Sequence, residues 1–284
     1  MPNYGYHLGR AHGAAFRRLY SASLPIIARR PVHSPRDLPL DVFSYSSEHD
    51  LPEQVASIRS FLRFAGRPLC FTVVSDGTHS ARSIAVLQSI SPVVRVTQVQ
   101  DYAAHNLPAS ARDYLANHPT GKQLALIMAL PEKGPALYVD SDVLFFPGAR
   151  ELAFIERTDS APPRYLSDCR LSADERLFQN EVEKENPVNT GVLLLFHRLQ
   201  WSDAFARFVS LTGPPNFFTN QTLTHLTMHA SGALPLDSAK YVLQLDDQFV
   251  YPDRHAASEI VLRHYVRPVR HKFWTTLANS KWAR

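Results

Sequence analysis

Residues 135–146 read PALYVDSDVLFF, an apolar stretch that carries two acidic side chains in its middle. Asp140 and Asp142 are separated by one serine, and residues i and i+2 of an extended backbone point to the same side. Two carboxylates among apolar residues are costly to bury unless a cation or protons compensate them. We therefore predict that the pair ends a buried strand and binds a divalent metal ion; the alternative is a solvated turn.

The chain before this stretch alternates between short apolar runs and helical spacing. Such alternation indicates strands that form a mostly parallel sheet with helices packed over it. Ligands of these sheets collect at the carboxyl ends of the strands. Strands are predicted at residues 41–45, 69–75, 93–99 and 135–139, and helices at residues 51–64, 81–90 and 121–130.

The second half predicts further strands and helices without a Gly/Ser-rich linker between the halves. We therefore expect a single α/β domain over residues 37–284, preceded by an extension over residues 1–36. The loop at residues 157–187 is expected to be a flexible or lid element. Strands are predicted at residues 188–196, 240–245 and 259–266, and helices at residues 201–211 and 221–230.

The composition excludes several classes of protein. With 45% apolar residues and no apolar run near the ~20 residues of a membrane helix, the 284-residue chain is not an integral membrane protein. The net charge is +4, yet residues 1–36 hold six arginines and no acid, so the remainder is slightly acidic and predicts no nucleic-acid partner. The two cysteines show no metal-binding or disulfide spacing, which favours a reducing, cytoplasmic location.

The basic extension has its own possible roles. Its arginines alternate with apolar side chains such as Phe16, Leu19 and Ile27, a pattern that allows peripheral contact with an anionic membrane surface. An ordinary ordered or frayed extension and a transit-like segment are the alternatives.

Three stretches together resemble a known family. The stretch YVDSDVLFF is similar to the metal-binding strand of GT-A nucleotide-sugar glycosyltransferases, particularly the retaining family eight, which includes glycogenin-like and bacterial lipopolysaccharide galactosyltransferase-like enzymes. Residues 189–195 (NTGVLLL) resemble its Asn-small-Gly strand, and residues 264–274 (HYVRPVRHKFW) its closing His…Lys-Pro-Trp element. The resemblance implies a Rossmann-like GT-A fold and a hexosyltransferase that uses a nucleotide-diphosphate sugar.

The resemblance also implies roles for individual residues. Asp140, Asp142 and His264 would bind Mn²⁺ or Mg²⁺, with manganese favoured by the imidazole ligand. The donor, expected to be a UDP-sugar, would contact Lys272, Lys122 and Ser141, and by architecture Tyr45 and Ser46. Asn189, Gln221 and Asp168 would border the donor sugar. Retention of the anomeric configuration is implied, and because Gln221 is a weak nucleophile, front-side attack is favoured. The acceptor, a glycan, lipid or protein, is not specified.

The chain departs from the family pattern at four positions. The family has Gly three residues and Lys six residues after the closing His, whereas here Arg267 stands at the third position and Lys272 at the eighth. Phe273 follows that lysine where the family typically has Pro. The family's Asp-Gln pair before a short helix appears as Asn220-Gln221, with one carboxylate fewer.

Other readings of these residues remain open. In a haloacid-dehalogenase-type phosphatase, Asp140 and Asp142 would act with Asp246-Asp247 and Lys240, although Leu144 and the 139 residues before the motif oppose that pattern. A nucleotidyltransferase would need a Gly-rich loop that residues 44–50 lack. A non-catalytic domain that binds a sugar nucleotide is the third alternative. Asn189, Gln221, His264 and Lys272 also have purely structural explanations, as strand, helix-start or surface residues.

Overall fold

The computed structural model describes residues 3–103, 107–155 and 160–279 of the chain. Its centre is a seven-stranded sheet with the order β3-β2-β1-β4-β7-β6-β8. Strands β3, β2, β1 and β4 run parallel, whereas β7 is antiparallel to both β4 and β6. The strands are β1 (Asp37–Ser46), β2 (Arg67–Ser75), β3 (Val94–Gln98), β4 (Ala136–Val139), β6 (Arg164–Ser167), β7 (Val188–Leu195) and β8 (Leu234–Pro235).

A second, three-stranded sheet adjoins the carboxyl end of β4. It has the order β5-β10-β9 and contains β5 (Val143–Phe145), β9 (Tyr241–Val242) and β10 (Leu262–His264). Strand β5 begins only four residues after β4 ends, so the two sheets are joined directly through the acidic pair. This junction decides where the acidic side chains lie.

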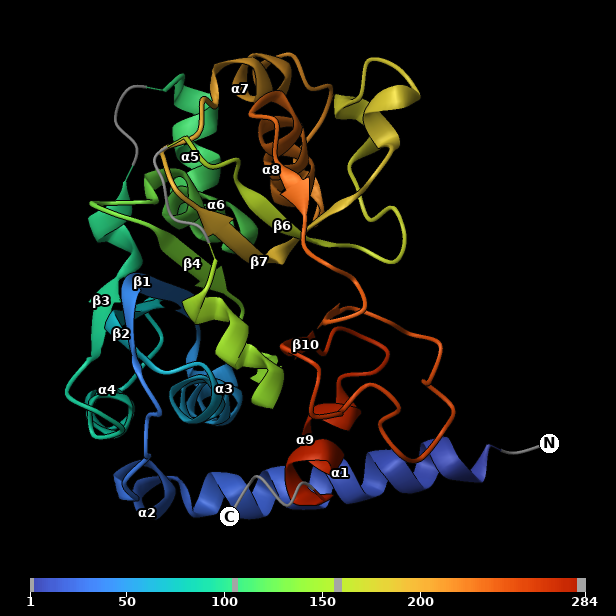
Figure 1. Cartoon of the computed structure of the whole chain (residues 1–284). Helices are drawn as coiled ribbons and strands as arrows, with labels where there is room; N and C mark the ends of the chain where they lie inside the picture. Colours follow the sequence, from blue (N-terminus) through green and yellow to red (C-terminus); the bar gives the residue numbers. More distant parts are fainter. Residues whose placement is uncertain (1–2, 104–106, 156–159, 280–284) are drawn as a thin grey trace.

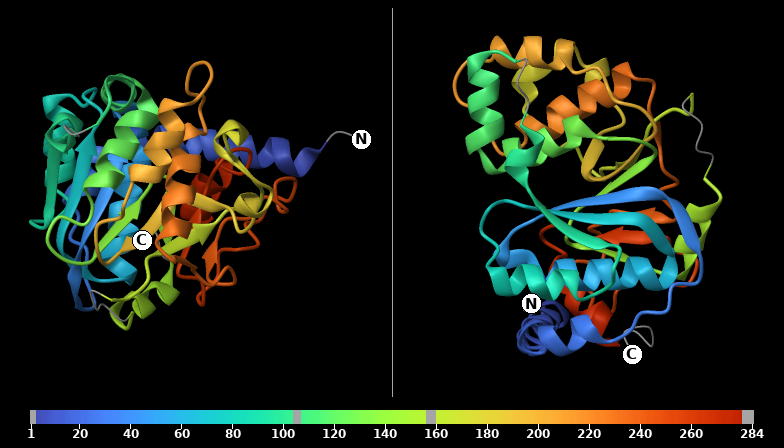
Figure 2. Two further views of the ribbon diagram at one scale, coloured as in Figure 1. Left: turned by 90° about the horizontal axis from the view of Figure 1, so that it is seen from above. Right: turned by 90° about the vertical axis from the view of Figure 1, so that its left-hand side faces the viewer.

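Helices cover both faces of the central sheet. Figures 1 and 2 show α3 and α4 on one face and α5, α6, α7 and α8 on the other. Two hydrophobic cores result, one on each face, as expected for a buried parallel sheet. The helices are α3 (Leu51–Phe64), α4 (Ala81–Gln88), α5 (Ala109–Asn117), α6 (Pro119–Ala129), α7 (Ser202–Val209) and α8 (Thr219–Ala230). Short 3₁₀ turns are η1 (Glu48–Asp50), η2 (Val99–Tyr102), η3 (Pro147–Ala153), η4 (Glu175–Leu177) and η5 (Val182–Lys184).

The predicted α/β class, with a mostly parallel sheet flanked by helices, is confirmed. The predicted loop at 157–187 is wrong at residues 164–167, which form β6 and pair with both β7 and β8. Residues 157–159 of that loop lie outside the described part of the chain. Strand β6 has only four residues, too few for a periodic signal, and its pairing with distant strands stabilises it.

The N-terminal segment forms two helices that pack against the end of the chain. Helix α1 (Tyr4–Ala22) packs against α9 (His271–Asn279), as Figure 1 shows, and α2 (Leu24–Arg29) follows it. A Cβ on Gly13 would lie 2.7 Å from the carbonyl oxygen of His271, so glycine permits this close helix contact. The ring of Tyr20 packs 5.2 Å from that of Trp274, centroid to centroid. None of the described helices is both long and apolar enough to span a bilayer.

A buried carboxylate ties α1 to α3. Glu53 is 3% exposed and accepts hydrogen bonds from the Arg17 guanidinium at 2.6 Å and from the Trp274 indole at 3.1 Å. These two donors compensate a buried charge that would otherwise be costly. Helices from the start, middle and end of the chain are thus joined at one residue.

One buried histidine predicts how stability depends on pH. The backbone N–H of Val188 donates to His225 Nδ1 at 3.2 Å, and His225 Nε2 lies 2.6 Å from the carbonyl oxygen of Glu183, so the ring is held neutral. Burial lowers the pKa of His225 to about 4. Between about pH 6.5 and 4 the unfolded chain therefore binds a proton that the folded chain does not, and the free energy of unfolding falls as the pH falls.

We predict that His225→Gln reduces the acid sensitivity of the fold. The wild-type chain should lose at most about 3 kcal/mol through this group on acidification, a loss that the variant lacks. Thermal unfolding from pH 7 to pH 4.5 measures the difference, with exposed His7→Gln as the matched control. Parallel pH profiles of the wild type and His225→Gln would contradict the assignment.

Candidate metal centre

The acidic pair lies in the turn that joins the two sheets. Strand β4 ends at Val139, and the N–H of Val143, the first residue of β5, donates to the Asp140 carbonyl at 3.3 Å. The two carboxylates do converge, as predicted, but the prediction that an extended backbone brings them together is wrong. A turn between two short strands brings them together, because the chain changes sheets at this point.

The third member of the cluster comes from β10, which is antiparallel to β5. Their register places His264 opposite Val143, and the Tyr265 N–H donates to the Asp142 carbonyl at 3.0 Å. The Nε2 atom of His264 lies 3.0 Å from Asp142 Oδ1 and 3.6 Å from Asp140 Oδ2. One potential ligand atom from each residue lies within 4.8 Å of the other two. Residues 140, 142 and 264, distant in sequence, thus form one acidic cluster.

A buried amide fixes the orientation of the imidazole. The Asn189 Oδ1 atom accepts the N–H of Gly191 at 2.9 Å and lies 3.0 Å from His264 Nδ1, while its Nδ2 donates to Asp168 at 3.2 Å. The amide oxygen can only accept, so Nδ1 carries the proton and donates to it. In the neutral ring, the lone pair of Nε2 therefore points toward the two carboxylates, which is how a second partner commonly orients a metal-binding histidine.

Gly191 makes room for this imidazole. Its carbonyl accepts the N–H of Asp140 at 2.9 Å, so it lies directly beside the acidic turn. A Cβ atom at this position would overlap with both Cε1 and Nδ1 of His264. Only glycine allows β7 and the histidine to approach so closely.

The three ionisable groups of the cluster shift one another's pKa values. Burial alone would lower the pKa of His264, but the Asp142 and Asp140 carboxylates outweigh burial and raise it. Burial raises the pKa of Asp140, and the neighbouring Asp142 adds to the rise. For Asp142, burial is outweighed by His264, and its pKa is lowered. Two carboxylates that share one imidazole leave excess negative charge, which a divalent cation would compensate.

Asp140 is held by a chain of neutral polar groups. Its Oδ1 atom accepts the Tyr138 hydroxyl at 2.7 Å and Gln123 Nε2 at 2.9 Å. The Oε1 atom of Gln123 in turn accepts Nδ2 of Asn220 at 2.9 Å. Gln123 was not anticipated from the sequence, which pointed to its neighbour Lys122. Lys122 is half-buried on α6 and makes no side-chain hydrogen bond or ion pair within the described residues.

Three residues expected to border a donor sugar do lie together. Asp168, which follows β6, accepts Gln221 Nε2 at 3.1 Å and Asn189 Nδ2 at 3.2 Å on the same oxygen. Gln221 also donates to the Ser172 carbonyl at 2.9 Å. Through Asn189 this group is connected to His264, and it lies at the edge of the sheet where β4 ends.

The last residues of β1 lie at the same edge of the sheet as the acidic cluster, because β1 and β4 are parallel. Tyr45 is half-buried and Ser46 is 2% exposed at the end of β1, whereas Ser141 is 7% exposed between the two aspartates. Burial raises the pKa of the Tyr45 hydroxyl, with the Asp76 carboxylate adding to the effect, so this hydroxyl stays a neutral donor. Asp50 is the last residue of the turn η1, which connects β1 to α3.

The structure places Lys272 away from the open side of the cluster. Its ammonium is fully buried and donates to the carbonyls of Val250 at 2.6 Å and Pro252 at 3.0 Å, and it lies 3.3 Å from Asp247. Burial lowers its pKa, although Asp247 opposes this. None of these contacts involves the acidic cluster.

Arg270 is the cation that faces the cluster. Its guanidinium lies 3.1 Å from Asp50 and 3.6 Å from Asp142, and its side chain is 37% exposed. Arg270 stands six residues after His264, the spacing at which the resembled family carries lysine. This spacing could have indicated Arg270 from the sequence alone, but the resemblance assigns the role to Lys272 because the family carries a lysine.

The residues that the phosphatase alternative requires beside Asp140 and Asp142 form ion pairs with other residues instead. Asp247 forms a buried salt bridge with Arg263 at 2.8 Å, and Arg263 also pairs with Asp253. Lys240 binds Glu151 at 2.7 Å. Asp246 and Asp247 form a separate cluster from Asp140 and Asp142, so the second acidic pair does not join the first.

Comparison with solved structures identifies the fold. The chain is similar to the galactosyltransferase LgtC in complex with donor and acceptor sugar analogues, at 15% identity and TM-score 0.55, over 84% of this chain and 95% of that one. Mouse xyloside xylosyltransferase 1 matches at 16% identity and TM-score 0.53, over 82% and 99%. The Streptococcus pneumoniae TIGR4 glycosyltransferase GlyE matches at 11% and 0.52, over 87% and 62%.

No protein-family model matches the chain, and no curated protein matches it in sequence. The structural matches nevertheless confirm the GT-A fold and, at the level of fold, the resemblance to GT-A glycosyltransferases. The acidic cluster lies at the carboxyl end of β4, the edge at which α/β sheets bind ligands.

We predict that Gly191→Ala disrupts the cluster without unfolding the chain. The added methyl group must displace His264, and Mn²⁺ affinity should fall by roughly 10- to 100-fold, as when a partner that orients a metal ligand is lost. Manganese titration followed by thermal shift measures the change. Gly134→Ala is the control, because a Cβ there meets no atom within 4 Å. An unchanged manganese affinity in Gly191→Ala would contradict the proposed geometry.

Proposed function

We propose that the protein is a metal-dependent glycosyltransferase that transfers a hexose from a nucleotide-diphosphate sugar to an acceptor. The observation that carries this proposal is the convergence of Asp140, Asp142 and His264 at the ligand-binding edge of a GT-A fold. The rival phosphatase function lacks its second acidic pair at this place, as described above. A non-catalytic domain that binds a sugar nucleotide would keep the same cluster and is distinguished by activity alone.

The donor set fits a manganese or magnesium ion. Two carboxylates and one neutral imidazole nitrogen are ligands that Mn²⁺ accepts, and the nitrogen favours manganese over magnesium. When bound, the ion would neutralise the two donor phosphates and so make the nucleoside diphosphate a better leaving group. Asn189 contributes by holding the His264 ring in the tautomer that leaves Nε2 available.

Arg270 is positioned to hold the departing diphosphate. A guanidinium binds phosphate oxygens in a bidentate manner, and this one is partly exposed beside Asp142. It would stabilise the negative charge that develops as the bond to the sugar breaks. We assign to Arg270 the role that the resemblance implied for Lys272, whose buried ammonium instead supports the loop around Asp247.

The sugar would lie against Asp168, Gln221 and Asn189. Asp168 offers a carboxylate for sugar hydroxyls, and the two amides that donate to it fix its orientation. The Gln221 Nε2 atom is engaged by Asp168 and Ser172, so a positioning role suits this residue better than nucleophilic attack. Retention of configuration follows from the family resemblance, and front-side attack is favoured because Gln221 is a weak nucleophile.

The remaining assignments complete the proposal. Tyr45 and Ser46 would contact the base, Ser141 and Lys122 the donor, and UDP is the expected nucleotide. The acceptor is a glycan, lipid or protein, and no nucleic acid is expected. We place the enzyme in the cytoplasm with peripheral membrane contact through residues 1–36. Exposed Leu8, Leu19 and Ile26 beside exposed arginines on the N-terminal helices support that contact.

Asp142→Asn tests the role of the cluster. The substitution keeps the size of the side chain but removes a direct ligand, so manganese-dependent release of UDP from UDP-glucose or UDP-galactose should fall by at least about 100-fold. Circular dichroism should show an intact fold. The exposed Asp203→Asn should retain wild-type turnover. Wild-type rates in Asp142→Asn, or equal rates in the presence of a chelator, would contradict the proposal.

Arg270 should influence chemistry more than donor binding. We expect Arg270→Gln to lower kcat on the order of 100-fold, because a group that stabilises charge in the transition state is lost, and Arg270→Lys to restore part of it. Steady-state kinetics with a UDP-sugar measure kcat and KM separately. The exposed Arg267→Gln is the control. A variant that raises KM alone would show instead that Arg270 contributes only uniform binding.

A further inference from the structure

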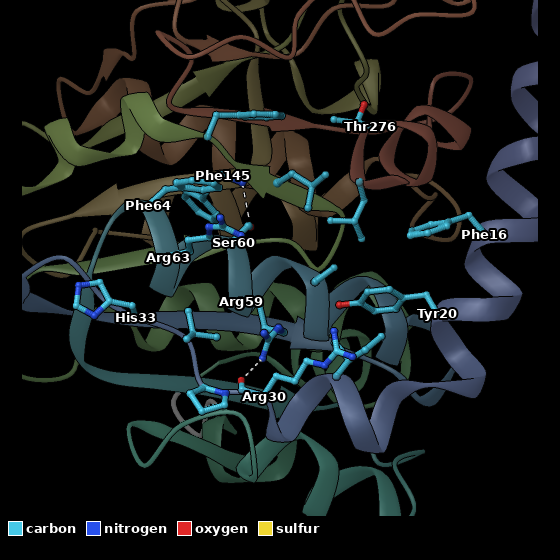
Figure 3. A pocket seen from close by; sticks show the side chains of 17 residues that line it. Phe16, Tyr20, Arg30, His33, Arg59, Ser60, Arg63, Phe64, Phe145 and Thr276 are labelled. Atoms are coloured by element: carbon cyan, nitrogen blue, oxygen red, sulfur yellow. Dashed lines mark hydrogen bonds between the residues drawn. The ribbon is translucent and has the colours of Figure 1, made fainter. Parts of the chain in front are cut away.

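A cavity of about 670 Å³ lies between the N-terminal helices, α3, β5 and α9 (Figure 3). This volume falls within the roughly 300 to 1,000 Å³ of small-molecule sites. None of the residues assigned above to the metal or to the donor lines it. The cavity is therefore separate from the proposed transferase site.

The walls of the cavity are mostly apolar. Aromatic and aliphatic side chains from α1, α2, α3 and β5 line it, including Phe16, Ile27, Phe64, Phe145 and Phe146. Phe145 is held in place by its N–H, which donates to Ser60 Oγ at 3.1 Å. Side chains of this kind bind a hydrocarbon chain through the hydrophobic effect.

One side of the cavity is positively charged. Arg59 on α3 and Arg30 at the end of α2 both line it, and the Arg59 guanidinium donates to the Arg30 carbonyl at 2.7 Å. Burial lowers the pKa of Arg59, and the nearby charges of Arg30 and Arg63 lower it further. Among the described residues, no aspartate or glutamate lines the cavity. Cations gathered without a carboxylate favour an anionic ligand.

A neutral hydroxyl lies beside these cations. Figure 3 shows Tyr20 extending from α1 toward Arg59. Burial raises the pKa of Tyr20, with Arg59 opposing the effect, so the hydroxyl remains a hydrogen-bond donor at neutral pH. Two guanidinium groups and a hydroxyl, all donors, match the oxygens of a phosphate group.

We propose that this cavity binds a single-chain lipid phosphate. The phosphate lies against Arg30, Arg59 and the Tyr20 hydroxyl, and the alkyl chain lies between the apolar walls. Charge complementarity selects the anionic head, and the adjoining aromatic walls select the chain, so neither part alone suffices. This combination distinguishes the cavity from a general phosphate site and from a general apolar groove.

Dodecyl phosphate, used below its micellar concentration, is the probe. Isothermal titration calorimetry on the full chain, without metal or sugar nucleotide, should show saturable 1:1 binding. Dodecyltrimethylammonium, with the same chain and opposite charge, and inorganic phosphate, with the head alone, should bind at least 10-fold more weakly. Equal binding of either compound would overturn the proposal. Because no donor is present, the outcome is independent of the proposed transferase activity.

Variants locate the site. Arg59→Gln removes the central cation, and Val32→Trp fills the cavity from its lining; each should weaken dodecyl phosphate binding at least 10-fold. Arg112→Gln, an exposed arginine on α5, should leave the affinity unchanged. Circular dichroism verifies each fold, and Arg30→Gln replaces any variant that does not fold. Wild-type affinity in the folded cavity variants would overturn the assignment.

Discussion

The structure depends on compensating two carboxylates that the fold brings together in one partly buried place. Asp140 and Asp142 follow a strand with no exposed residue, and His264 provides the nearest group able to carry positive charge. Asp140 and Asp142 share this imidazole, and the Arg270 guanidinium lies 3.6 Å from Asp142; the pKa of Asp140 is raised and that of Asp142 is lowered. Two carboxylates this close, with one partly exposed guanidinium beside them, form a donor set that suits a divalent cation.

The rest of the fold serves to hold this arrangement. The chain passes from the large sheet to the small one at the acidic turn. In the small sheet, the pairing of β10 with β5 places His264 beside this turn. Asn189 and Gly191 on β7 fix the ring by a hydrogen bond and by the space they leave. Gln123 holds Asp140 from the opposite face. Each contact joins segments far apart in sequence, so the site exists only when both sheets are formed.

Sequence periodicity predicts the regular part of this fold, namely helices packed on a mostly parallel sheet. Helix α3 occupies the predicted residues 51–64, because its apolar residues Val55, Ile58, Phe61 and Leu62 repeat with helical spacing. Strand β6 and helix α5 are not predicted: β6 has only four residues and pairs with strands distant in sequence, and the nine residues of α5 pack mainly against the following helix α6. Helix α1 is not predicted either, although it packs against α9 at the other end of the chain.

The candidate site is predictable where spacing carries chemistry. Asp140, Asp142 and His264 follow from motif order, but the role of Gln123 depends on which side of α6 faces the sheet. Arg270 and Lys272 are both candidates in the sequence for binding the donor diphosphate. Only the folded structure distinguishes them, because Lys272 is buried whereas Arg270 is partly exposed. Sequence gives the identity of charged groups, whereas their exposure is a property of the folded chain.

The most direct measurement is a crystal structure of the protein with Mn²⁺ and UDP, with data collected at the manganese absorption edge. We expect an anomalous peak among Asp140, Asp142 and His264, with the UDP diphosphate beside Arg270. Saturating ligand with no anomalous peak among these three side chains, or a peak elsewhere with UDP bound there, would show that the acidic cluster is not the metal site.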